Sequence, residues 1–521
     1  MERLAALASV AVTFFETLLL LLLVAVLLLQ VARRVHLPYP TMLAAAGVAV
    51  AMVPGAPSIP IDPETALALF IAPVLIDAGY DFPLGAARKL AAPLVVYAVG
   101  AVALTAALVA LVGVEMLGLP IAAALTLGAI VAPPDAAAAT AVIVNLPVAR
   151  RVDAVLKGES LFNDATALLL FTAALTIQER GGLDLSTGAQ LALAAPGGIA
   201  FGIGYGLLVR RLQPLLGNTT GATISQFVHC FLTWIIAERL HLSAVLAVVA
   251  SAMTIAADAP RTDNPRMRVH SFAVWTTVVF LLNVVAFLLM GMQARRLVGA
   301  MSPAELVQAA WFATAVIGTV VATRLLIAFG YRWWVVRRYR SGRGPEPIAR
   351  GETLLVGWTG MRGLVTLATA FALPADFPRR DLLVLTAFAV VLATLVVQGA
   401  TLAPLIRWLG VERRDDAEHE LVEGRAALAE AALARLDGEK GEAAEDLRRG
   451  WHTLRNGEQE HEALTRRRDV ALAAVLAARE RLERLRAEHR VGADGYLQLQ
   501  EELDWKQLAV VSDEDRRIAE M

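Results

Sequence analysis

Cysteine and charged side chains are both scarce in this sequence of 521 residues. Cys230 stands alone, which excludes an intramolecular disulfide framework and a cysteine-based metal cluster. Charged residues make up 18% of the chain, against roughly a quarter in an ordinary soluble protein. Hydrophobic residues reach 57%, and the mean hydropathy is +0.59. The composition therefore predicts an integral membrane protein.

The charges that remain are nearly balanced and unevenly placed. The formal net charge of −1 gives no reason to expect nucleic-acid binding. Charges are sparse over residues 1–410 and dense over residues 411–521, which contain no glycine-rich phosphate-binding loop. We expect a transmembrane domain over 1–410 and a helical cytoplasmic tail over 411–521, for which a regulatory role is an alternative to simple packing.

Apolar segments long enough to cross a bilayer recur along the first domain. A transmembrane helix needs about 20 mainly apolar residues, and on that criterion there are about 13 candidate spans. We expect the first to be a transmembrane helix and not a cleaved signal, because it leads directly into Arg33 and Arg34 without a cleavage site. The spans lie near residues 8–32, 40–55, 65–80, 90–116, 119–145, 157–178, 186–209, 222–239, 242–258, 271–293, 303–330, 352–373 and 382–406.

Basic residues gather in alternate loops between these spans. Basic residues mark cytoplasmic loops, so this bias predicts an external N-terminus and a cytoplasmic tail in the inner membrane. An odd number of spans requires the same orientation. The basic loop positions are Arg33, Arg34, Arg88, Lys89, Arg150, Arg151, Arg210, Arg211, Arg261, Arg266, Arg268 and the arginines from Arg332 to Arg343.

Few ionisable residues lie inside the spans, and each costs roughly 2.5–3.5 kcal/mol at a helix centre. Such residues usually face a water-filled cavity or a partner, so they are the candidates for function. Acids outnumber bases among them, which favours a cation site. They are Asp77, Asp135, Glu159, Asp164, Arg324 and Arg362.

Two spans are predicted to break near mid-membrane. Pro133 and Pro134 precede Asp135 in the fifth span, where prolines remove amide donors and clash with the preceding turn. Gly360 and Gly363 flank an arginine in the twelfth span and loosen that helix. Under an inverted repeat of six spans these two breaks are mirror images, and such paired breaks indicate a transporter site at the midplane.

The sixth span carries two acids five residues apart, Glu159 and Asp164, which on a regular helix point about 140° away from each other. One of them therefore needs another partner, and an arginine on a neighbouring helix is the natural one. Asp164 is the better titrating group, since Asn163 beside it can hydrogen-bond and burial disfavours its charged form. A buried carboxylate can hold a proton or a small cation but not both. Ser160, one turn earlier, can add a hydroxyl oxygen to an oxygen-only site suited to Na⁺ or Li⁺.

These segments resemble the cation:proton antiporters of the NhaP-like, sodium/proton-exchanger branch. The resemblance rests on GESLFND, on GAIVAPPDAAAAT, on WTGMRGLVTLATAFALP and on FIAPVLIDAG, and it covers residues of about 10–410 in the expected order. It implies an all-α fold of 13 transmembrane helices in inverted repeats, a homodimer, and alternating access by a moving core bundle. The polar tail resembles the tails of bacterial members.

The resemblance also implies roles for the buried charges. Asp164 would bind the ion and the proton, with Asp135, Ser160 and Asn163 completing the site. Glu159 would pair with an arginine, for which Arg324 is the first choice and Arg362 the second. Family members with Asn-Asp at this place resemble electroneutral exchangers, which trade one Na⁺ for one H⁺. A single carboxylate at this place suggests the same stoichiometry.

The chain departs from the family pattern at two places. Many members have Thr-Asp-Pro where this chain has Pro134, Asp135 and Ala136, so the threonine ligand is missing and a carbonyl, water or, less plausibly, Thr140 would replace it. Many members have glutamate in the third helix where this chain has the shorter Asp77, which alternatively caps a helix or lies near the surface.

Several other functions fit parts of the pattern. A K⁺/H⁺ antiporter on the same fold is the nearest alternative. A passive cation channel needs rings of carboxylates, whereas these charges are paired and asymmetric. An intramembrane aspartyl protease needs two carboxylates that share a proton, and its Gly-x-Gly-Asp motif is absent. We expect no enzyme activity and no cofactor, with membrane lipid, protons and monovalent cations as the partners.

Overall fold

The structure is a computed structural model in which part of the chain is described. The described residues are 63–82, 90–135, 150–182, 185–216, 219–257, 265–343, 345–410, 416–455, 461–488, 490–491 and 493–511, with scattered positions between 19 and 47. The predicted spans 8–32 and 40–55 lie largely outside them, as do Ala136, Thr140 and the second half of the fifth span. The full count of spans and the inverted repeat therefore stay predictions.

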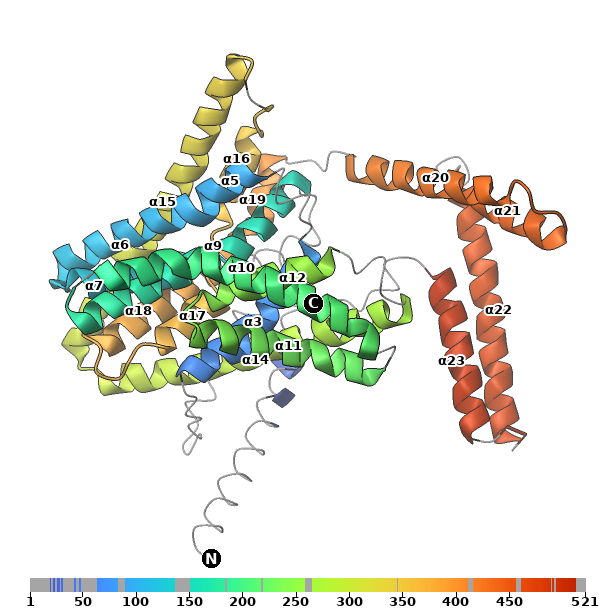
Figure 1. The fold of residues 1–521 in the computed structure, drawn as a ribbon, viewed down its shortest axis with the longest axis horizontal. Helices are drawn as coiled ribbons and strands as arrows, with labels where there is room; N and C mark the ends of the chain where they lie inside the picture. The colour runs from blue at the N-terminus through green and yellow to red at the C-terminus, as the bar shows by residue number, and fades with distance from the viewer. Residues whose placement is uncertain are drawn as a thin grey trace, which may run out of the picture. The chain divides into compact units, whose positions relative to one another are not determined.

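The chain divides into two compact units, residues 1–412 and residues 413–520, here called the membrane unit and the tail unit. The described residues of both units form helices and no strand. In the membrane unit the helices (Figure 1) are α3 (Pro63–Asp81), α5 (Ala91–Leu94), η1 (Val95–Ala101), α6 (Val102–Leu117), α7 (Ile121–Val131), α9 (Arg150–Arg180), α10 (Leu185–Leu216), α11 (Thr220–Arg239), α12 (Ala244–Ala256), α14 (Pro265–Ala300), α15 (Pro303–Arg340), α16 (Arg350–Trp358), α17 (Leu364–Phe371), α18 (Arg380–Ala393), η2 (Thr394–Gln398) and α19 (Gly399–Leu409).

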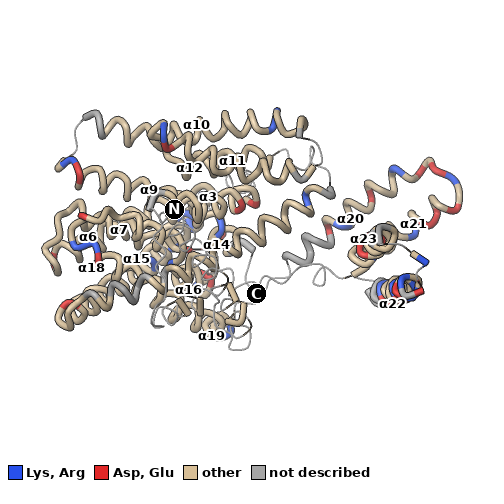
Figure 2. The backbone as a smooth tube through the Cα atoms, turned by 90° about the horizontal axis from the view of Figure 1, so that it is seen from below, with Lys and Arg blue, Asp and Glu red and all other residues tan. Residues whose placement is uncertain are grey.

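Six of the described helical segments are long and apolar enough to cross a membrane. They are Ala91–Leu117, Ala154–Arg180, Gly188–Leu215, Met267–Leu289, Pro303–Arg340 and Arg380–Leu409. Two shorter apolar helices, Ile121–Val131 and Ala244–Ala256, lie among them. Lysine, arginine and acidic residues are rare along these helices, whereas the tail unit carries both signs of charge (Figure 2). The chain is thus a multi-pass α-helical membrane protein.

The two predicted breaks are present. Helix α7 ends at Val131, two residues before Pro133, and residues 133–135 are not helical. Helix α16 ends at Trp358 and α17 begins at Leu364, so the segment Thr359–Gly363 separates two half-helices. Both breaks follow from local sequence, because proline lacks an amide donor and glycine is a poor helix former.

Close helix packing in the membrane unit depends on small residues. Gly198, Gly202 and Gly206 recur every four residues on α10 and face the backbone of α12. A Cβ atom at Gly198 would lie 2.6 Å from the carbonyl oxygen of Ser243, and one at Gly206 would lie 3.0 Å from that of Ser251. Small residues at such spacing let transmembrane helices approach closely and gain van der Waals contact.

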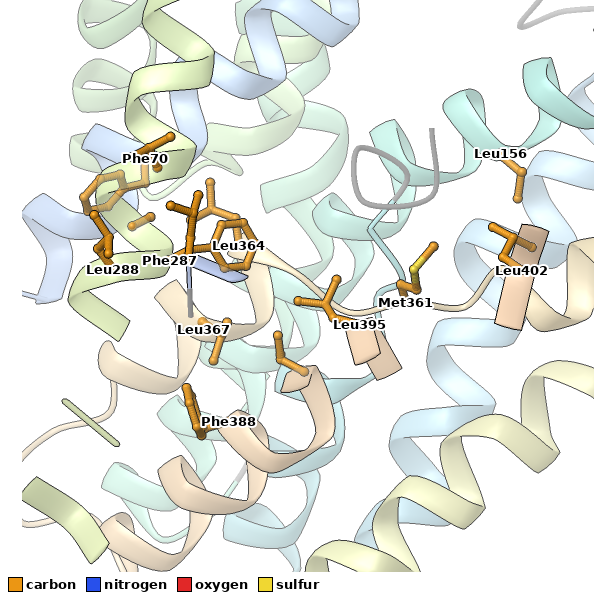
Figure 3. Packing of buried hydrophobic residues seen from close by; sticks show 14 of the residues in the cluster. Phe70, Leu156, Phe287, Leu288, Met361, Leu364, Leu367, Phe388, Leu395 and Leu402 are labelled. Carbon is orange, nitrogen blue, oxygen red and sulfur yellow. The ribbon is translucent and has the colours of Figure 1, made fainter. Parts of the chain in front are cut away.

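A buried apolar cluster surrounds the break between α16 and α17. Met361 and Leu364 flank Arg362 and are 0% and 4% exposed. They belong to a cluster with residues of α3, α9, α14 and α19 (Figure 3). The broken segment is therefore held by side chains from several helices, although its own backbone is irregular. The labelled members of the cluster are Phe70, Leu156, Phe287, Leu288, Met361, Leu364, Leu367, Phe388, Leu395 and Leu402.

Two long spans contain π-helical segments that the sequence did not predict. η1 interrupts the span Ala91–Leu117, and η2 interrupts the span Arg380–Leu409. A π-helical turn inserts an extra residue into the helix and often occurs at functional sites. Here each segment carries a polar side chain, Tyr97 or Thr394, that contacts one of the two buried arginines described below.

The tail unit consists of four described helices, α20 (Asp416–Leu436), α21 (Glu442–Arg455), α22 (His461–Ala487) and α23 (Ala493–Val510). α20 packs against α21, and α22 packs against α23. Arg479 of α22 forms an ion pair with Asp504 of α23, and Val475 and Leu482 of α22 are buried. The helical character predicted for residues 411–521 thus agrees with the described part.

Candidate functional site

The candidate site lies where the two broken segments meet. The amide of Asp135 donates a hydrogen bond to the carbonyl oxygen of Met361 at 2.7 Å. This bond joins residues 226 positions apart, so it crosses directly from one broken segment to the other. Irregular backbone at membrane depth is tolerated where protein or water covers it, and the partner segment supplies that cover here.

Arg362 supplies hydrogen-bond donors to the carbonyl groups at the end of α7. Its Nε donates to the carbonyl oxygen of Val131 at 3.0 Å, and its Nη2 donates to that of Ala132 at 3.2 Å. Its Nη1 also donates to the carbonyl oxygen of Gly360. The last carbonyls of a helix lack intrahelical donors and form the negative end of the helix dipole. A cation at this point, 1% exposed, satisfies both needs.

Asp135 occupies the reciprocal position at the start of α17. Its Oδ2 lies 3.4 Å from the amide of Leu364, the first residue of that helix. The first amides of a helix form the positive end of its dipole, where a carboxylate is favoured. Gly363 permits this approach, because a Cβ atom there would collide with the Asp135 carboxylate. Each broken segment therefore places a charge at a helix end of the other one, Arg362 at the end of α7 and Asp135 at the start of α17. We call the region where the two segments meet the crossing.

Helix α9 brings four of the predicted site residues beside this crossing. Asn163 donates from Nδ2 to the carbonyl oxygen of Pro134 at 2.8 Å, which ties α9 to the first break. Asp164 is 7% exposed, Asn163 is fully buried and Ser160 is half-buried. The carboxylates of Asp135 and Asp164 are close enough for their charges to interact.

Glu159 lies on α9 but is committed to an ion pair. Its two carboxylate oxygens receive hydrogen bonds from Nη1 and Nη2 of Arg324 on α15, the second at 2.9 Å. Both side chains are almost fully buried, with 1% and 4% exposure. Arg324 also lies over the ring of Tyr97, 5.8 Å from its centre, within the range of a cation–π contact. Arg324 is thus the arginine beside Glu159, while Arg362 binds backbone carbonyls.

Asp164 differs from Glu159 in its surroundings. Among the described residues, no lysine or arginine forms an ion pair with Asp164. Ser160 lies one turn before it on the same helix face, and Asn163 Oδ1 is buried without a hydrogen-bond partner among the described residues. Carboxylate, hydroxyl and amide oxygens are the ligands of hard cations. No group of three histidine, cysteine or acidic residues within the described segments has the arrangement of a metal cluster.

Asp77 lies on α3, which packs against α17 and α9, and it is half-buried. Its role on the ion path stays a prediction.

Several polar residues at the crossing were not predicted from the sequence. Thr394 accepts a hydrogen bond from the amide of Arg362 at 3.1 Å. Thr366 on α17 and Gln398 at the end of η2 are buried, with side-chain polar atoms that lack partners among the described residues. Their signal was available as polar residues within apolar spans, but threonine commonly bonds its own helix backbone and is easily passed over.

The comparisons with known proteins identify the family of the chain. A family model described as the transmembrane sodium/hydrogen exchanger matches residues 18–408. An uncharacterised Na⁺/H⁺ exchanger of Mycobacterium tuberculosis is 30% identical over 423 residues, covering 78% of this chain and 76% of that protein. The Na⁺/H⁺ antiporter NhaH of Halobacillus dabanensis is 30% identical over 304 residues, covering 57% of this chain and 71% of that protein.

The fold also matches a solved transporter. The sodium proton antiporter MjNhaP1 of Methanocaldococcus jannaschii superposes with a TM-score of 0.59 at 16% identity, covering 78% of this chain and 99% of that chain. Helical architecture and paired helix breaks define a membrane transporter. The chain belongs to the sodium/hydrogen exchanger family, whose members are cation/proton antiporters and not enzymes.

Proposed function

We propose that this protein exchanges Na⁺ or Li⁺ for H⁺ across the inner membrane by alternating access, with Asp164 as the carboxylate that binds either ion. The observation that carries the proposal is the distribution of charge at the crossing. Glu159 is paired with Arg324 and Asp135 faces the start of α17, whereas Asp164 has no cationic partner among the described residues. Asp164 is therefore the carboxylate available to a transported ion.

Burial explains why the two fluxes are coupled. An isolated charged carboxylate in the protein interior costs several kcal/mol, so an empty, ionised Asp164 resists the movement that exposes the other side. A proton or a Na⁺ ion removes that charge and permits the movement. One carboxylate that carries one Na⁺ in one direction and one H⁺ in the other moves no net charge. The exchange is thus electroneutral.

The remaining ligands of Na⁺ come from groups around Asp164. Asp135, the Ser160 hydroxyl and the Asn163 amide oxygen supply oxygen atoms, and water completes the shell. The threonine that many family members have before the α7 aspartate is Pro134 here. Its carbonyl oxygen is held by Asn163 Nδ2, so Asn163 acts on the first break as well as beside Asp164. No cofactor takes part.

The orientation in the membrane follows from the distribution of basic residues, and the homodimer is what the resemblance to the antiporter family implies. Basic residues mark the cytoplasmic loops, which places the N-terminus outside and residues 411–521 in the cytoplasm as a regulatory tail. Residues 1–410 form the transport domain of a homodimer in which the core bundle moves against the dimerisation domain.

Exchange of K⁺ for H⁺ is the second candidate. The sodium, potassium, lithium and rubidium/H⁺ antiporter of Bacillus subtilis is 27% identical over 390 residues, covering 70% of this chain and 57% of that protein. That relative is named as an antiporter of K⁺ as well as Na⁺, which supports K⁺ as an alternative substrate on the same fold.

Proton flux in proteoliposomes with an imposed pH gradient tests the proposal. Adding Na⁺ or Li⁺ to the wild type should dissipate the gradient, and Asp164→Asn should abolish this flux. The rate should be the same with the membrane potential clamped at zero or set inside-negative. A proton flux in response to K⁺ alone would show that the substrate is K⁺ and not Na⁺. A rate that follows the membrane potential would exclude electroneutral exchange. Normal flux in Asp164→Asn would overturn the assignment of the site.

A further inference from the structure

Helix α15 is too long to be contained within a bilayer. Its 38 residues extend for about 57 Å, whereas the hydrocarbon core of a membrane is about 30 Å thick. In Figure 1 its C-terminal part projects past α5 and α16. The part of α15 beyond the hydrocarbon core therefore lies outside the apolar part of the membrane, and its side chains indicate what surrounds it.

Two exposed tryptophans locate the membrane along α15. Trp311 is 71% exposed and Trp333 is 62% exposed. They are about 22 residues apart, or roughly 33 Å along the helix, which matches the distance between the two interfaces of a bilayer. Tryptophan concentrates at those interfaces. Leu326, 64% exposed, and Phe329, 42% exposed, lie between them and face lipid.

Arginines follow immediately beyond Trp333. Arg337 lies over the ring of Trp333, 5.2 Å from its centre, and Arg338 lies over that of Trp334 at 4.9 Å. These arginines are one turn beyond the tryptophans, about 6 Å along the axis, at the depth of lipid headgroups. The stacking holds both exposed side chains beside the interface, and Arg338 Nη2 also donates a long hydrogen bond to the carbonyl oxygen of Arg343, at 3.5 Å.

This cluster of positive charge forms no ion pair with a carboxylate among the described residues. The sequence contains no aspartate or glutamate between Glu305 and Glu346. Among the described residues, no acidic side chain forms an ion pair with Arg337, Arg338 or Arg340. The helix ends at Arg340, and Arg332 donates to the carbonyl oxygen of Ile348, which fixes the returning chain beside it.

We propose that the end of α15 binds anionic phospholipids of the cytoplasmic leaflet through Arg337, Arg338 and Arg340, with Trp333 and Trp334 at the interface. Arginine binds phosphate oxygens with two parallel donors, and clusters of basic residues next to a transmembrane helix bind anionic lipid surfaces. Lipid is the occupant because the arginines continue a lipid-facing apolar surface, which a soluble phosphate would not use. The site fixes the depth of the helix that carries Arg324.

The test measures the thermal unfolding temperature of the detergent-purified full chain, with and without added phosphatidylglycerol, and counts bound lipids by native mass spectrometry. Phosphatidylglycerol should raise the wild-type unfolding temperature, and phosphatidylcholine should not. Arg337→Gln with Arg338→Gln should weaken phosphatidylglycerol binding about twentyfold. Lysine at both positions should restore part of it, because the charge remains without the paired donors.

Arg210→Gln with Arg211→Gln is the matched control, since it removes the same charge from the end of α10. It should respond to phosphatidylglycerol like the wild type. An equal loss in this control would show a general effect of charge and would overturn the site, as would an unchanged response in the α15 variant. A destabilisation of the α15 variant that is the same with and without phosphatidylglycerol would show that the arginines contact protein, and it would overturn the site.

Discussion

Glu159 and Asp164 are two acids on one helix, five residues apart, in different electrostatic situations. Their angular separation on a regular helix predicts that they need separate partners. In the structure Glu159 forms a buried bidentate ion pair with Arg324. The resemblance made Arg324 the first choice over Arg362, but spacing alone does not distinguish the two, because the pairing depends on which helices are neighbours. Glu159 is therefore committed to the fold, and we propose that Asp164 binds the ion.

Glu159→Gln should destabilise the protein strongly. It leaves the Arg324 guanidinium buried without its carboxylate, and breaking a buried pair in this way costs about 3–5 kcal/mol. Thermal unfolding in detergent measures the loss, with Glu439→Gln as the control because its partner Arg435 lies in an exposed pair. The double variant Glu159→Gln with Arg324→Gln should lose less than the sum of the single variants. A single variant as stable as the wild type would contradict the structural role of the pair.

Two buried threonines should respond oppositely to the same substitution. Thr366→Val replaces a hydroxyl that has no hydrogen-bond partner among the described residues, so stability should be kept or raised. Thr394→Val removes the acceptor of the Arg362 amide and should cost about 1–3 kcal/mol. The order of the two unfolding temperatures is the readout. A Thr366→Val protein less stable than Thr394→Val would show that Thr366 has a bonded partner.

At the scale of elements, each broken segment at the crossing is stabilised by a charged side chain from the other one. Arg362 comes from the break between α16 and α17 and satisfies the end of α7, while Asp135 comes from the break after α7 and faces the start of α17. Each broken helix thus supplies the charge that the other one needs. Removing either charge is expected to affect both segments.

Gly363→Ala should disrupt the crossing although it adds only a methyl group. The new Cβ atom would collide with the Asp135 carboxylate and push it from the start of α17. We expect lower stability and loss of exchange, measured by thermal unfolding and proton flux. Gly318→Ala on α15 is the control, because nothing lies within 4 Å of a Cβ atom there. Alanine favours helices over glycine by up to about 1 kcal/mol, so the control should be neutral or slightly stabilising. Equal behaviour of the two variants would contradict the close contact.

The sequence predicted the helix breaks better than the helix ends. Proline and glycine act locally, so the breaks at Pro133 and Gly363 could be placed from the chain itself. The end of α15 was predicted near residue 330 but lies at Arg340, since charged residues leave the membrane without leaving the helix. For the same reason α9 and α14 extend beyond the predicted 157–178 and 271–293.

The π-helical segments could not be predicted, because no local residue pattern defines them. η1 and η2 place Tyr97 and Thr394 against Arg324 and Arg362, contacts that depend on tertiary packing. The candidate acids were visible in the sequence as costly residues in apolar spans. Their partners became visible only when helices far apart in the chain were brought together.

At the scale of the whole molecule, we propose that one carboxylate serves two ions in turn. The chain belongs to the sodium/hydrogen exchanger family and shares its fold with MjNhaP1, and in our proposal the charge distribution around α9 couples the two fluxes. The tail unit has its own packed helix pairs, so it is expected to modify transport and not to form the ion site.

The central claim is that Na⁺ and H⁺ compete for Asp164, and proton release on Na⁺ binding tests it most directly. Calorimetric titration of the purified protein with Na⁺, in buffers that differ in ionisation enthalpy, gives the number of protons released per bound ion. If Asp164 holds both ions, the release should approach one proton per Na⁺ where Asp164 is protonated before binding, and Asp164→Asn should show neither binding nor release. Undiminished Na⁺ binding with proton release in Asp164→Asn would contradict it, because another group would then hold both ions.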